Sequence, residues 1–265
     1  AHERRGAALV GLSLARPLAQ AGRADGAVFG VFAREGAAGA GLTGGENEHG
    51  VPDFVFYDLE TAPWDMDALR SWCSGLRRTA GDAAPATLVR IPPVGDAPEE
   101  ARRRIAEGVG AGADGLILPQ VESPEEVRVA VEALRGAGRR LWPVDADADS
   151  LLVVQIESRE AVAAAGEILG AEGVAVGLPG QNDLRVSYAG DERAVQEAVD
   201  AVRAVCDGLG LPCGVTAGAD DVARRLERGF RFIIATAPEA VAVGRARQGA
   251  WRSLFILSRM ERPCG

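Results

Sequence analysis

The sequence predicts an α/β protein folded as a closed (β/α)8 TIM barrel. Strand-like apolar runs alternate with helix-like segments eight times over the 265 residues, and no Pro/Gly/Ser-rich linker separates them. Two of the runs are continuous and apolar rather than alternating, which is typical of parallel strands buried on both faces. We therefore expect a single barrel domain over residues 1–265. A doubly wound open sheet is disfavoured, because no Gly-rich phosphate turn follows the first strand.

The elements follow one another in regular order. The expected strands are the short apolar runs at residues 27–32, 54–58, 87–91, 115–118, 151–156, 173–176, 213–216 and 232–235. The expected helices cover residues 66–76, 99–109, 124–134, 160–169, 191–209, 220–227 and 238–259. Ser123-Pro124-Glu125-Glu126 is the best-marked helix start, with Ser as N-cap, Pro at the first helical position and Glu three residues on. Five glycines between Gly36 and Gly45 weaken a helix there by roughly 1 kcal/mol each, so segment 36–50 is either a poor helix, which we favour, or a mobile lid.

The composition excludes several classes of protein. A net charge of −9 argues against nucleic acid or an anionic membrane as partner, since both require a basic face. No apolar stretch approaches the ~18 residues that span a bilayer, and the first residues lack the apolar core of a signal peptide. The four cysteines form no CxxC pair, which indicates reduced thiols, so we expect a cytoplasmic protein. Only two histidines, His2 and His49, are present for any histidine-based mechanism.

Two carboxylates follow two successive apolar runs. Glu157 directly follows the apolar run at residues 151–156, and Asp183 follows the run that begins at residue 173. In a barrel, the C-terminal ends of the strands carry the chemistry. Two acids that converge there repel one another unless a cation lies between them, and a hard divalent metal such as Mg²⁺ would leave positions open for substrate. Alternatively, Glu157 caps a helix and Asp183 caps a turn.

Other polar residues stand at expected strand ends. Asp58 and Glu60 follow the second strand, Arg90 lies in the third, and Gln155 lies in the fifth. Two roles are open for Arg90. It either forms a structural ion pair with Asp58 or Glu60, or it uses its planar guanidinium to bind a substrate carboxylate or an enolate oxygen. The backbone of the turn 180–182 could cradle a carboxylate. Together these groups suit a 2-oxo acid whose enolate is stabilised by the metal.

Five stretches of the sequence together match one known family: DFVFYDLE at 53–60, LVRIP at 88–92, GADGLILPQVES at 112–123, QIESREA at 155–161 and NDL at 182–184. They resemble the HpcH/HpaI aldolases, which are metal-dependent pyruvate aldolases related to the citrate lyase β-subunit and macrophomate synthase. The resemblance implies a (β/α)8 barrel that acts on a small 2-oxo acid. It also implies a homo-oligomer, a trimer or hexamer, in which the C-terminal helix is exchanged between subunits.

The resemblance also implies roles for individual residues. Glu157 and Asp183 would bind Mg²⁺, Mn²⁺ or Co²⁺, and Arg90 would be catalytic. The expected substrate-binding residues are Gln155, Gly180, Asn182 and Ser123.

Thr61 is a departure from the family pattern. Family aldolases have Asp-x-Glu-His after the second strand, whereas this chain has Asp58-Leu59-Glu60-Thr61. A Thr hydroxyl cannot take up a proton near neutral pH, so acid/base assistance worth roughly 10²–10⁴-fold is missing or relocated. Glu60, Asp58 or a metal-bound water are better candidate bases than His49, which precedes the second strand.

Three functions remain open on the sequence. The first is a metal-dependent carbon–carbon lyase or aldolase acting on a 2-oxo acid through a metal-stabilised enolate. The second is a repurposed biosynthetic member, a decarboxylase or a synthase resembling macrophomate synthase, which the Thr61 change favours over a catabolic aldolase. The third is a non-catalytic barrel that binds an oxo acid, which the joint presence of Glu157, Asp183, Arg90 and Gln155 argues against.

Overall fold

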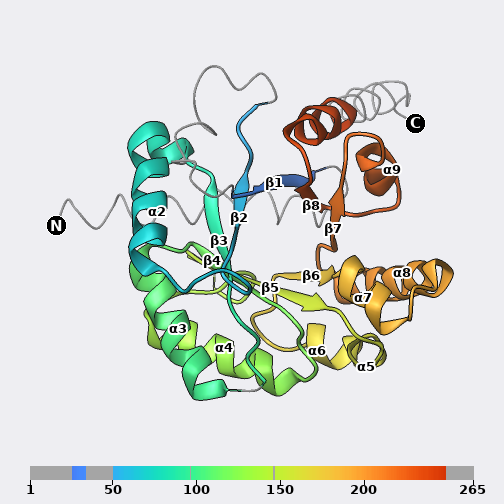
Figure 1. The fold of residues 1–265 in the computed structure, drawn as a ribbon, viewed down its shortest axis with the longest axis horizontal. Helices are drawn as coiled ribbons and strands as arrows, with labels where there is room; N and C mark the ends of the chain where they lie inside the picture. The colour runs from blue at the N-terminus through green and yellow to red at the C-terminus, as the bar shows by residue number, and fades with distance from the viewer. Residues whose placement is uncertain (1–25, 34–49, 96, 146, 249–265) are drawn as a thin grey trace, which may run out of the picture.

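The computed structural model describes residues 26–33, 50–95, 97–145 and 147–248. Its centre is a sheet of eight parallel strands in the order β6-β5-β4-β3-β2-β1-β8-β7, which curves into a nearly closed barrel (Figure 1). The strands are β1 (Val28–Phe32), β2 (Phe54–Asp58), β3 (Ala86–Arg90), β4 (Gly115–Leu118), β5 (Leu151–Ile156), β6 (Val176–Pro179), β7 (Gly214–Ala217) and β8 (Phe232–Ala235). The chain is therefore a (β/α)8 barrel, as the sequence predicts.

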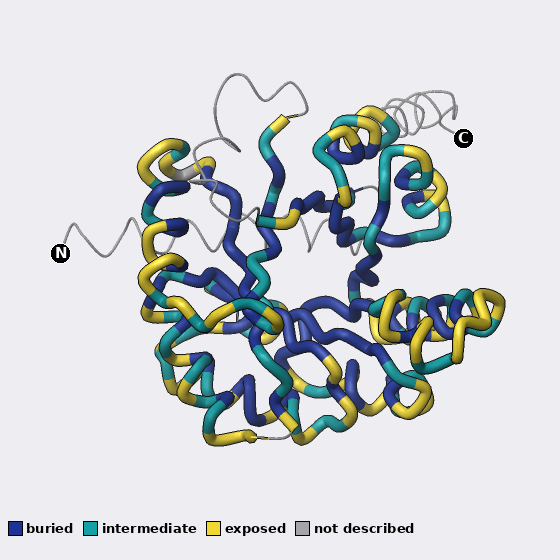
Figure 2. Tube along the Cα trace, in the orientation of Figure 1, coloured by how far each residue is buried: buried dark blue, intermediate teal, exposed yellow. Residues whose placement is uncertain are grey.

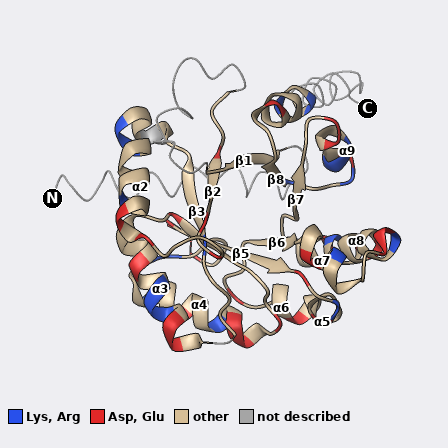
Figure 3. Cartoon of the chain, in the orientation of Figure 1, with Lys and Arg blue, Asp and Glu red and all other residues tan. Residues whose placement is uncertain are grey.

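From β2 onward, helices cover the outside of the barrel between successive strands (Figure 1). They are α2 (Met66–Ala80), α3 (Pro98–Ala111), α4 (Pro124–Gly136), α5 (Arg159–Ala163), α6 (Ala165–Leu169), α7 (Gln181–Ser187), α8 (Glu192–Leu209) and α9 (Val222–Glu227), with a 3-10 turn at Gly81–Ala83. Residues 238–248 are also helical and pack on β1, where Ala240 and Val241 are buried and a Cβ at Gly244 would lie 2.2 Å from Phe29. Charged residues are concentrated in these helices rather than in the strands, most visibly in α3 and α4 (Figure 3).

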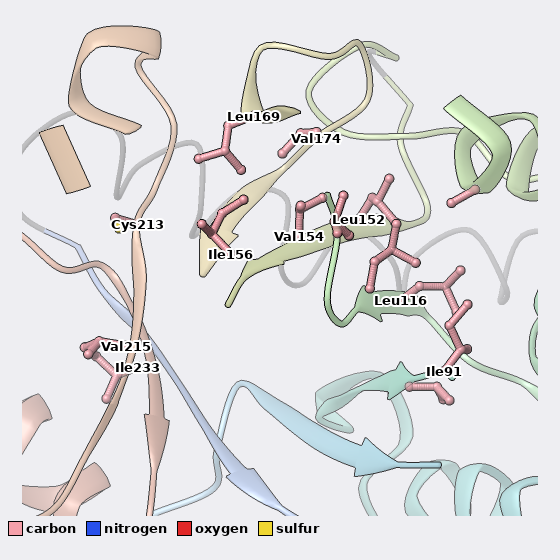
Figure 4. Close-up of a cluster of buried hydrophobic side chains, with 14 of the residues drawn as sticks. Ile91, Leu116, Leu152, Val154, Ile156, Leu169, Val174, Cys213, Val215 and Ile233 are labelled. Atoms are coloured by element: carbon pink, nitrogen blue, oxygen red, sulfur yellow. The ribbon is translucent and has the colours of Figure 1, made fainter. Parts of the chain in front are cut away.

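Strand alternation divides the apolar residues into two layers. Side chains on one parity fill the barrel interior, where the Phe54 and Phe232 rings stack at 4.2 Å between centroids. Side chains on the other parity pack outward against the helices, as Leu116, Val154 and Ile233 do in Figure 4. Figure 2 shows the result, with buried strands inside and helices exposed on their outer faces. The same alternation decides which polar residues face the mouth of the barrel.

The barrel has one weak seam, between β6 and β7. Every other neighbouring pair forms a parallel ladder, but here the described residues show a single bridge, Gly177 to Cys213, with one hydrogen bond from Gly177 N to Pro212 O at 3.3 Å. This seam lies beside the strand that leads to Asp183.

The structure differs from the expected elements in three places. The helix expected over residues 160–169 is two short helices, α5 and α6, which are separated at Ala164. The sixth strand lies three residues later than expected, at Val176–Pro179, because Val174 and Ala175 belong to the buried entry that precedes the ladder. The predicted turn at 180–182 is instead the start of α7. The segment 36–49, His2, His49, Cys264 and residues 249–259, over which the sequence predicts helix, lie outside the described residues. No helix within the described ranges is long and apolar enough to cross a membrane.

Candidate active site

Strand alternation brings three predicted residues to the inside of the mouth. Asp58, Arg90 and Gln155 occupy the same parity on β2, β3 and β5 as interior residues such as Phe56, so their side chains converge at the C-terminal ends of the strands.

Arg90 forms ion pairs with both acids that follow β2. Its Nε and Nη2 donate to the two oxygens of Asp58 at 2.9 and 2.5 Å, and its Nη1 lies 2.8 Å from Glu60 Oε2. The guanidinium also lies 5.2 Å from the centre of the Phe56 ring. The ion pair that we considered on the sequence therefore exists. The two Arg90 hydrogens that these bonds leave are the ones available to a substrate.

Glu157 is fixed at the base of the mouth, with 4% of its surface exposed. Its Oε2 accepts from the backbone N–H of Gln120 at 2.8 Å, and its Oε1 accepts from Gln155 Nε2 at 2.8 Å. Gln120 has φ +51°, an uncommon value for a residue other than glycine. The same Gln120 donates from Nε2 to Glu60 Oε1 at 3.0 Å, so one residue links the two acids.

The electrostatic setting of Glu157 is unfavourable for a carboxylate. Burial, with the nearby charges of Asp183 and Glu60, raises the pKa of Glu157 to about 7, although the Gln120 hydrogen bond opposes that rise. Burial also raises the pKa of Glu60, against the lowering effect of Arg90. Glu60, Glu157 and Asp183 therefore form a mutually repelling group of acids.

Gly180 allows β6 to run close to Glu157. A Cβ at this position would lie 2.1 Å from Glu157 Oε1, so any larger residue would force the hydrogen-bonded Glu157 side chain to shift. Gly180 is the N-cap of α7, and Asn182 and Asp183 lie in the exposed first turn of that helix. A short helix, rather than a turn, thus places Asp183 beside the mouth.

A cavity of about 440 Å³ opens at this mouth. Six of the predicted site residues line it: Arg90, Gln155, Glu157, Gly180, Asn182 and Asp183. The remaining lining residues are Phe32, Phe56, Leu178, Pro179, Gln181, Thr216, Ala217, Gly218, Asp221, Arg225, Ile234 and Thr236. The structure thus brings six of the ten predicted site residues into one cavity, and it pairs Asp58 and Glu60 with Arg90, which lines that cavity.

Thr61 and Ser123 are not among the residues that line this cavity. Thr61 is exposed. Ser123 is the N-cap residue of α4, and its hydroxyl donates to Glu126 Oε1 at 3.0 Å rather than capping a backbone N–H.

Sequence reasoning missed Gln120 and the wall formed by Thr216, Arg225 and Thr236. Gln120 stands two residues after Leu118, the last residue of β4. Its position near the C-terminal end of a strand could have marked it as a candidate site residue. Arg225 carried no signal, because it lies within α9 and reaches the cavity only through the packing of that helix.

The donor set fits a hard cation. All the candidate ligands are oxygens, and Gln155 Oε1 is buried without a hydrogen-bond partner beside Glu157. The repulsion that raises the pKa of Glu157 is the condition that a bound cation relieves. Among the described residues, no three His, Cys, Asp or Glu side chains form a ready metal cluster, so the pair Glu157 and Asp183 would leave the other positions to water and substrate.

The chain matches one family model and is similar in fold to several solved structures. A family model described as HpcH/HpaI aldolase/citrate lyase matches residues 46–240. An HpcH/HpaI aldolase/citrate lyase family protein from Burkholderia cenocepacia is 22% identical, with a TM-score of 0.66 over 92% of this chain and 99% of that one. Macrophomate synthase is 19% identical, with a TM-score of 0.68 over 94% and 91%.

A third solved structure was determined with ligands. The citrate lyase β-subunit of M. tuberculosis, in complex with oxaloacetate and magnesium, is 18% identical, with a TM-score of 0.57 over 84% and 96% of the two chains. No curated protein sequence matches the chain. The family model covers most of the barrel, so the chain belongs to the HpcH/HpaI aldolase/citrate lyase family.

Proposed function

We propose that this protein is a divalent-metal-dependent carbon–carbon lyase of the aldolase type that acts on a small 2-oxo acid through an enolate. The observation that carries the proposal is one cavity lined by Arg90, Gln155, Glu157 and Asp183 at the C-terminal mouth of the barrel. That combination of a cation-binding acid pair and a guanidinium is the equipment for stabilising negative charge on an oxygen.

Glu157 and Asp183 would hold the ion, Mg²⁺ or alternatively Mn²⁺ or Co²⁺. When bound, such an ion supplies Lewis-acid stabilisation of the charge that develops on the keto oxygen of the substrate. Gln120 and Gln155 keep the carboxylate of Glu157 in a fixed orientation through hydrogen bonds to its two oxygens.

The remaining residues would position the oxo acid. Arg90 is held rigid by Asp58 and Glu60, so its two remaining hydrogens are preorganised to donate to a substrate oxygen. Asn182 and Asp183 stand in the first turn of α7, and their backbone N–H groups, which lack intrahelical acceptors, would receive the substrate carboxylate. The N–H of Gly180 donates instead to Ile156 O at 3.0 Å, so Gly180 contributes the close approach of the backbone. The unpartnered Gln155 Oε1 would accept a hydrogen bond from substrate or water.

Proton transfer would fall to Glu60, since Thr61 cannot perform it. Burial raises the pKa of Glu60, and the raised pKa favours uptake of a proton by this carboxylate. Asp58 is less suited, because Arg90 engages both of its oxygens, whereas Arg90 engages only one oxygen of Glu60 and the other accepts from the neutral amide of Gln120.

A second candidate is a repurposed decarboxylase or synthase, which the exposed Thr61 in place of a histidine favours. Loss of CO2 from an oxaloacetate-like acid needs charge stabilisation only, because water can protonate the resulting carbanion.

Proton NMR of pyruvate in D2O separates the two candidates. Samples would contain Mg²⁺ or Mn²⁺, with and without EDTA, and would be repeated with oxaloacetate. EDTA-sensitive exchange of the methyl protons supports the aldolase with a working base. Metal-dependent decarboxylation without exchange favours the repurposed enzyme, and neither signal would refute both.

The acid pair can be tested by metal binding alone. We expect Glu157→Ala and Asp183→Ala each to abolish Mn²⁺ binding, measured by calorimetry or by the electron paramagnetic resonance of free Mn²⁺. Glu160→Ala is the matched control, because Glu160 is an exposed acid in the first turn of α5. Intact affinity in Glu157→Ala would show that the metal assignment is wrong.

A further inference from the structure

Gln120 makes two hydrogen bonds at the mouth of the barrel, one from its backbone and one from its side chain. The backbone N–H donates to Glu157 Oε2 at 2.8 Å, and the side-chain Nε2 donates to Glu60 Oε1 at 3.0 Å. The proposed function uses only the first of these bonds, which orients a proposed metal ligand. The second bond is a contact to which that chemistry gives no role.

The side-chain bond completes the support of Glu60. The side chain of Glu60 is 12% exposed, and its Oε2 lies 2.8 Å from Arg90 Nη1. Arg90 is a fixed cation that can only donate, and Asp58 already holds its Nε and Nη2. Glu60 therefore has a charged partner on Oε2 and a neutral partner, the Gln120 amide, on Oε1. Of the two oxygens, the one beside the neutral partner takes up a proton more easily, because no cation opposes it there.

An amide suits a carboxyl group that gains and loses a proton. Gln120 carries a donor, its NH2 group, and an acceptor, its carbonyl oxygen, so a half-turn about the last side-chain bond exchanges one for the other. The NH2 group serves the ionised carboxylate, and the carbonyl oxygen would accept from the protonated form. Gln120 is exposed, so few neighbouring atoms oppose this half-turn.

We propose that Gln120 is the positioning residue for proton transfer by Glu60, with its amide donating to the carboxylate and, after the half-turn, accepting from the protonated carboxyl group. The inference rests on the proposed function, which makes Glu60 the base. Neither Glu60 nor Gln120 is among the residues that line the cavity, so one water molecule would carry the proton between the substrate and Glu60.

The proton transfer is balanced as follows for pyruvate. A methyl C–H bond breaks, and its electron pair becomes the enolate. The water takes this proton and passes one of its own to Glu60 Oε1, where an O–H bond forms. Return of a deuteron by the same route in D2O exchanges the methyl protons without any net reaction.

Three variants of Gln120 separate its side chain from its backbone. Gln120→Met nearly keeps the shape of the side chain without its hydrogen bond, and Gln120→Gly also relieves the positive φ of +51°. Gln120→Lys keeps a donor but has no acceptor. All three keep the backbone N–H that binds Glu157, so Mn²⁺ affinity should not change. Gln196→Met is the matched control, because Gln196 lies on α8 and bonds there to Asp200 and Arg228.

Methyl-proton exchange of pyruvate and decarboxylation of oxaloacetate are measured on each variant with Mg²⁺. Only the exchange needs Glu60, since water can protonate the carbanion that loss of CO2 leaves. We expect Gln120→Met and Gln120→Gly to slow the exchange about 10- to 100-fold in kcat with little change in KM, and to leave decarboxylation unchanged. Gln120→Lys should be slowed as well. In a Glu60→Gln background, Gln120→Met should have no further effect, as expected for a residue that acts through Glu60.

A loss of exchange alone, absent from Gln196→Met, supports the positioning role. Equal losses of exchange and decarboxylation, full exchange in Gln120→Met, or a further loss in the Glu60→Gln background would each overturn it. Full exchange in Gln120→Lys would overturn the accepting role of the amide. Wild-type decarboxylation without exchange would overturn the inference and leave the repurposed decarboxylase standing, whereas the absence of both activities from wild type would refute the proposed function as well.

Discussion

At the residue scale, one buried carboxylate determines how this site behaves. Glu157 accepts two hydrogen bonds, yet burial and two neighbouring acids raise its pKa to about 7. A metal-free protein at neutral pH thus carries this group partly protonated, and a cation must displace the proton in order to bind.

The first residue-scale prediction concerns stability against pH. A carboxylate whose folded pKa lies above its unfolded value binds more protons in the folded state, so metal-free stability should fall as pH rises from about 4.5 to about 7. The difference is at most about 3 kcal/mol. Thermal melts in EDTA at several pH values, compared between wild type and Glu157→Gln, measure it. Excess Mg²⁺ should reduce the loss, and identical pH profiles for the two proteins would contradict the prediction.

Replacing Arg90 should lower the turnover of oxaloacetate without preventing metal binding. Arg90→Ala removes the guanidinium from Asp58 and Glu60 but leaves the proposed metal ligands in place. We expect Mn²⁺ to remain bound at pH 8, while turnover of oxaloacetate falls on the order of 10²–10³-fold. Arg90→Lys keeps the charge without the fork and shows how much depends on geometry. Unchanged turnover in a folded Arg90→Ala variant would show that Arg90 has only a structural role, as the ion-pair partner of Asp58 and Glu60.

At the scale of elements, the site depends on how closely two of them approach. β6 ends at Pro179 and passes through Gly180 into α7 while in contact with Glu157 at the end of β5. That approach brings Asp183 toward an acid that stands 26 positions earlier in the chain.

Gly180→Ala tests this approach. Gly180 has φ −84°, which Ala adopts without strain, so any effect comes from the Cβ that would meet Glu157 at 2.1 Å. We expect Mg²⁺ affinity to fall tenfold or more, about 1.4 kcal/mol, with the fold retained. Gly110→Ala is the control, since nothing lies within 4 Å of a Cβ there and the change should stabilise α3 by about 0.5–1 kcal/mol. An unaltered affinity in Gly180→Ala would show that Glu157 can shift without loss.

At the scale of the whole molecule, the barrel is a ring of seven ladders closed by one bridge at the β6–β7 seam. The seam lies between the strand that leads to Asp183 and the strand that leads to α9 and Arg225. The C-terminal helix begins on its own barrel, where Arg245 donates to Val51 O at 2.7 Å. Exchange of that helix and assembly into a trimer or hexamer stay predictions.

The seam should be visible in hydrogen exchange. We expect peptides covering residues 212–217 to exchange faster than peptides covering β5 (Leu151–Ile156), because β5 is hydrogen-bonded along both edges and β7 along one. Mass-spectrometric exchange of the intact protein measures this. Equal protection of the two segments would indicate that the seam is as stable as a ladder.

The sequence by itself determined the barrel and most of the proposed oxo-acid site. Continuous apolar runs mark buried parallel strands, and in such a barrel a polar residue at the end of a strand faces the mouth when it has the parity of the interior residues. Asp58, Arg90, Gln155 and Glu157 could therefore be predicted from their positions alone.

Only the tertiary structure decided what those residues touch. The double ion pair of Arg90, the positive φ that turns Gln120 N–H onto Glu157, and the place of Arg225 in the cavity depend on contacts between segments far apart in the chain. No local pattern encodes them, because a helix residue such as Arg225 reaches a site through packing rather than through strand alternation. The sequence thus set which residues stand at the mouth, and the packing of α7 and α9 set the walls that they share.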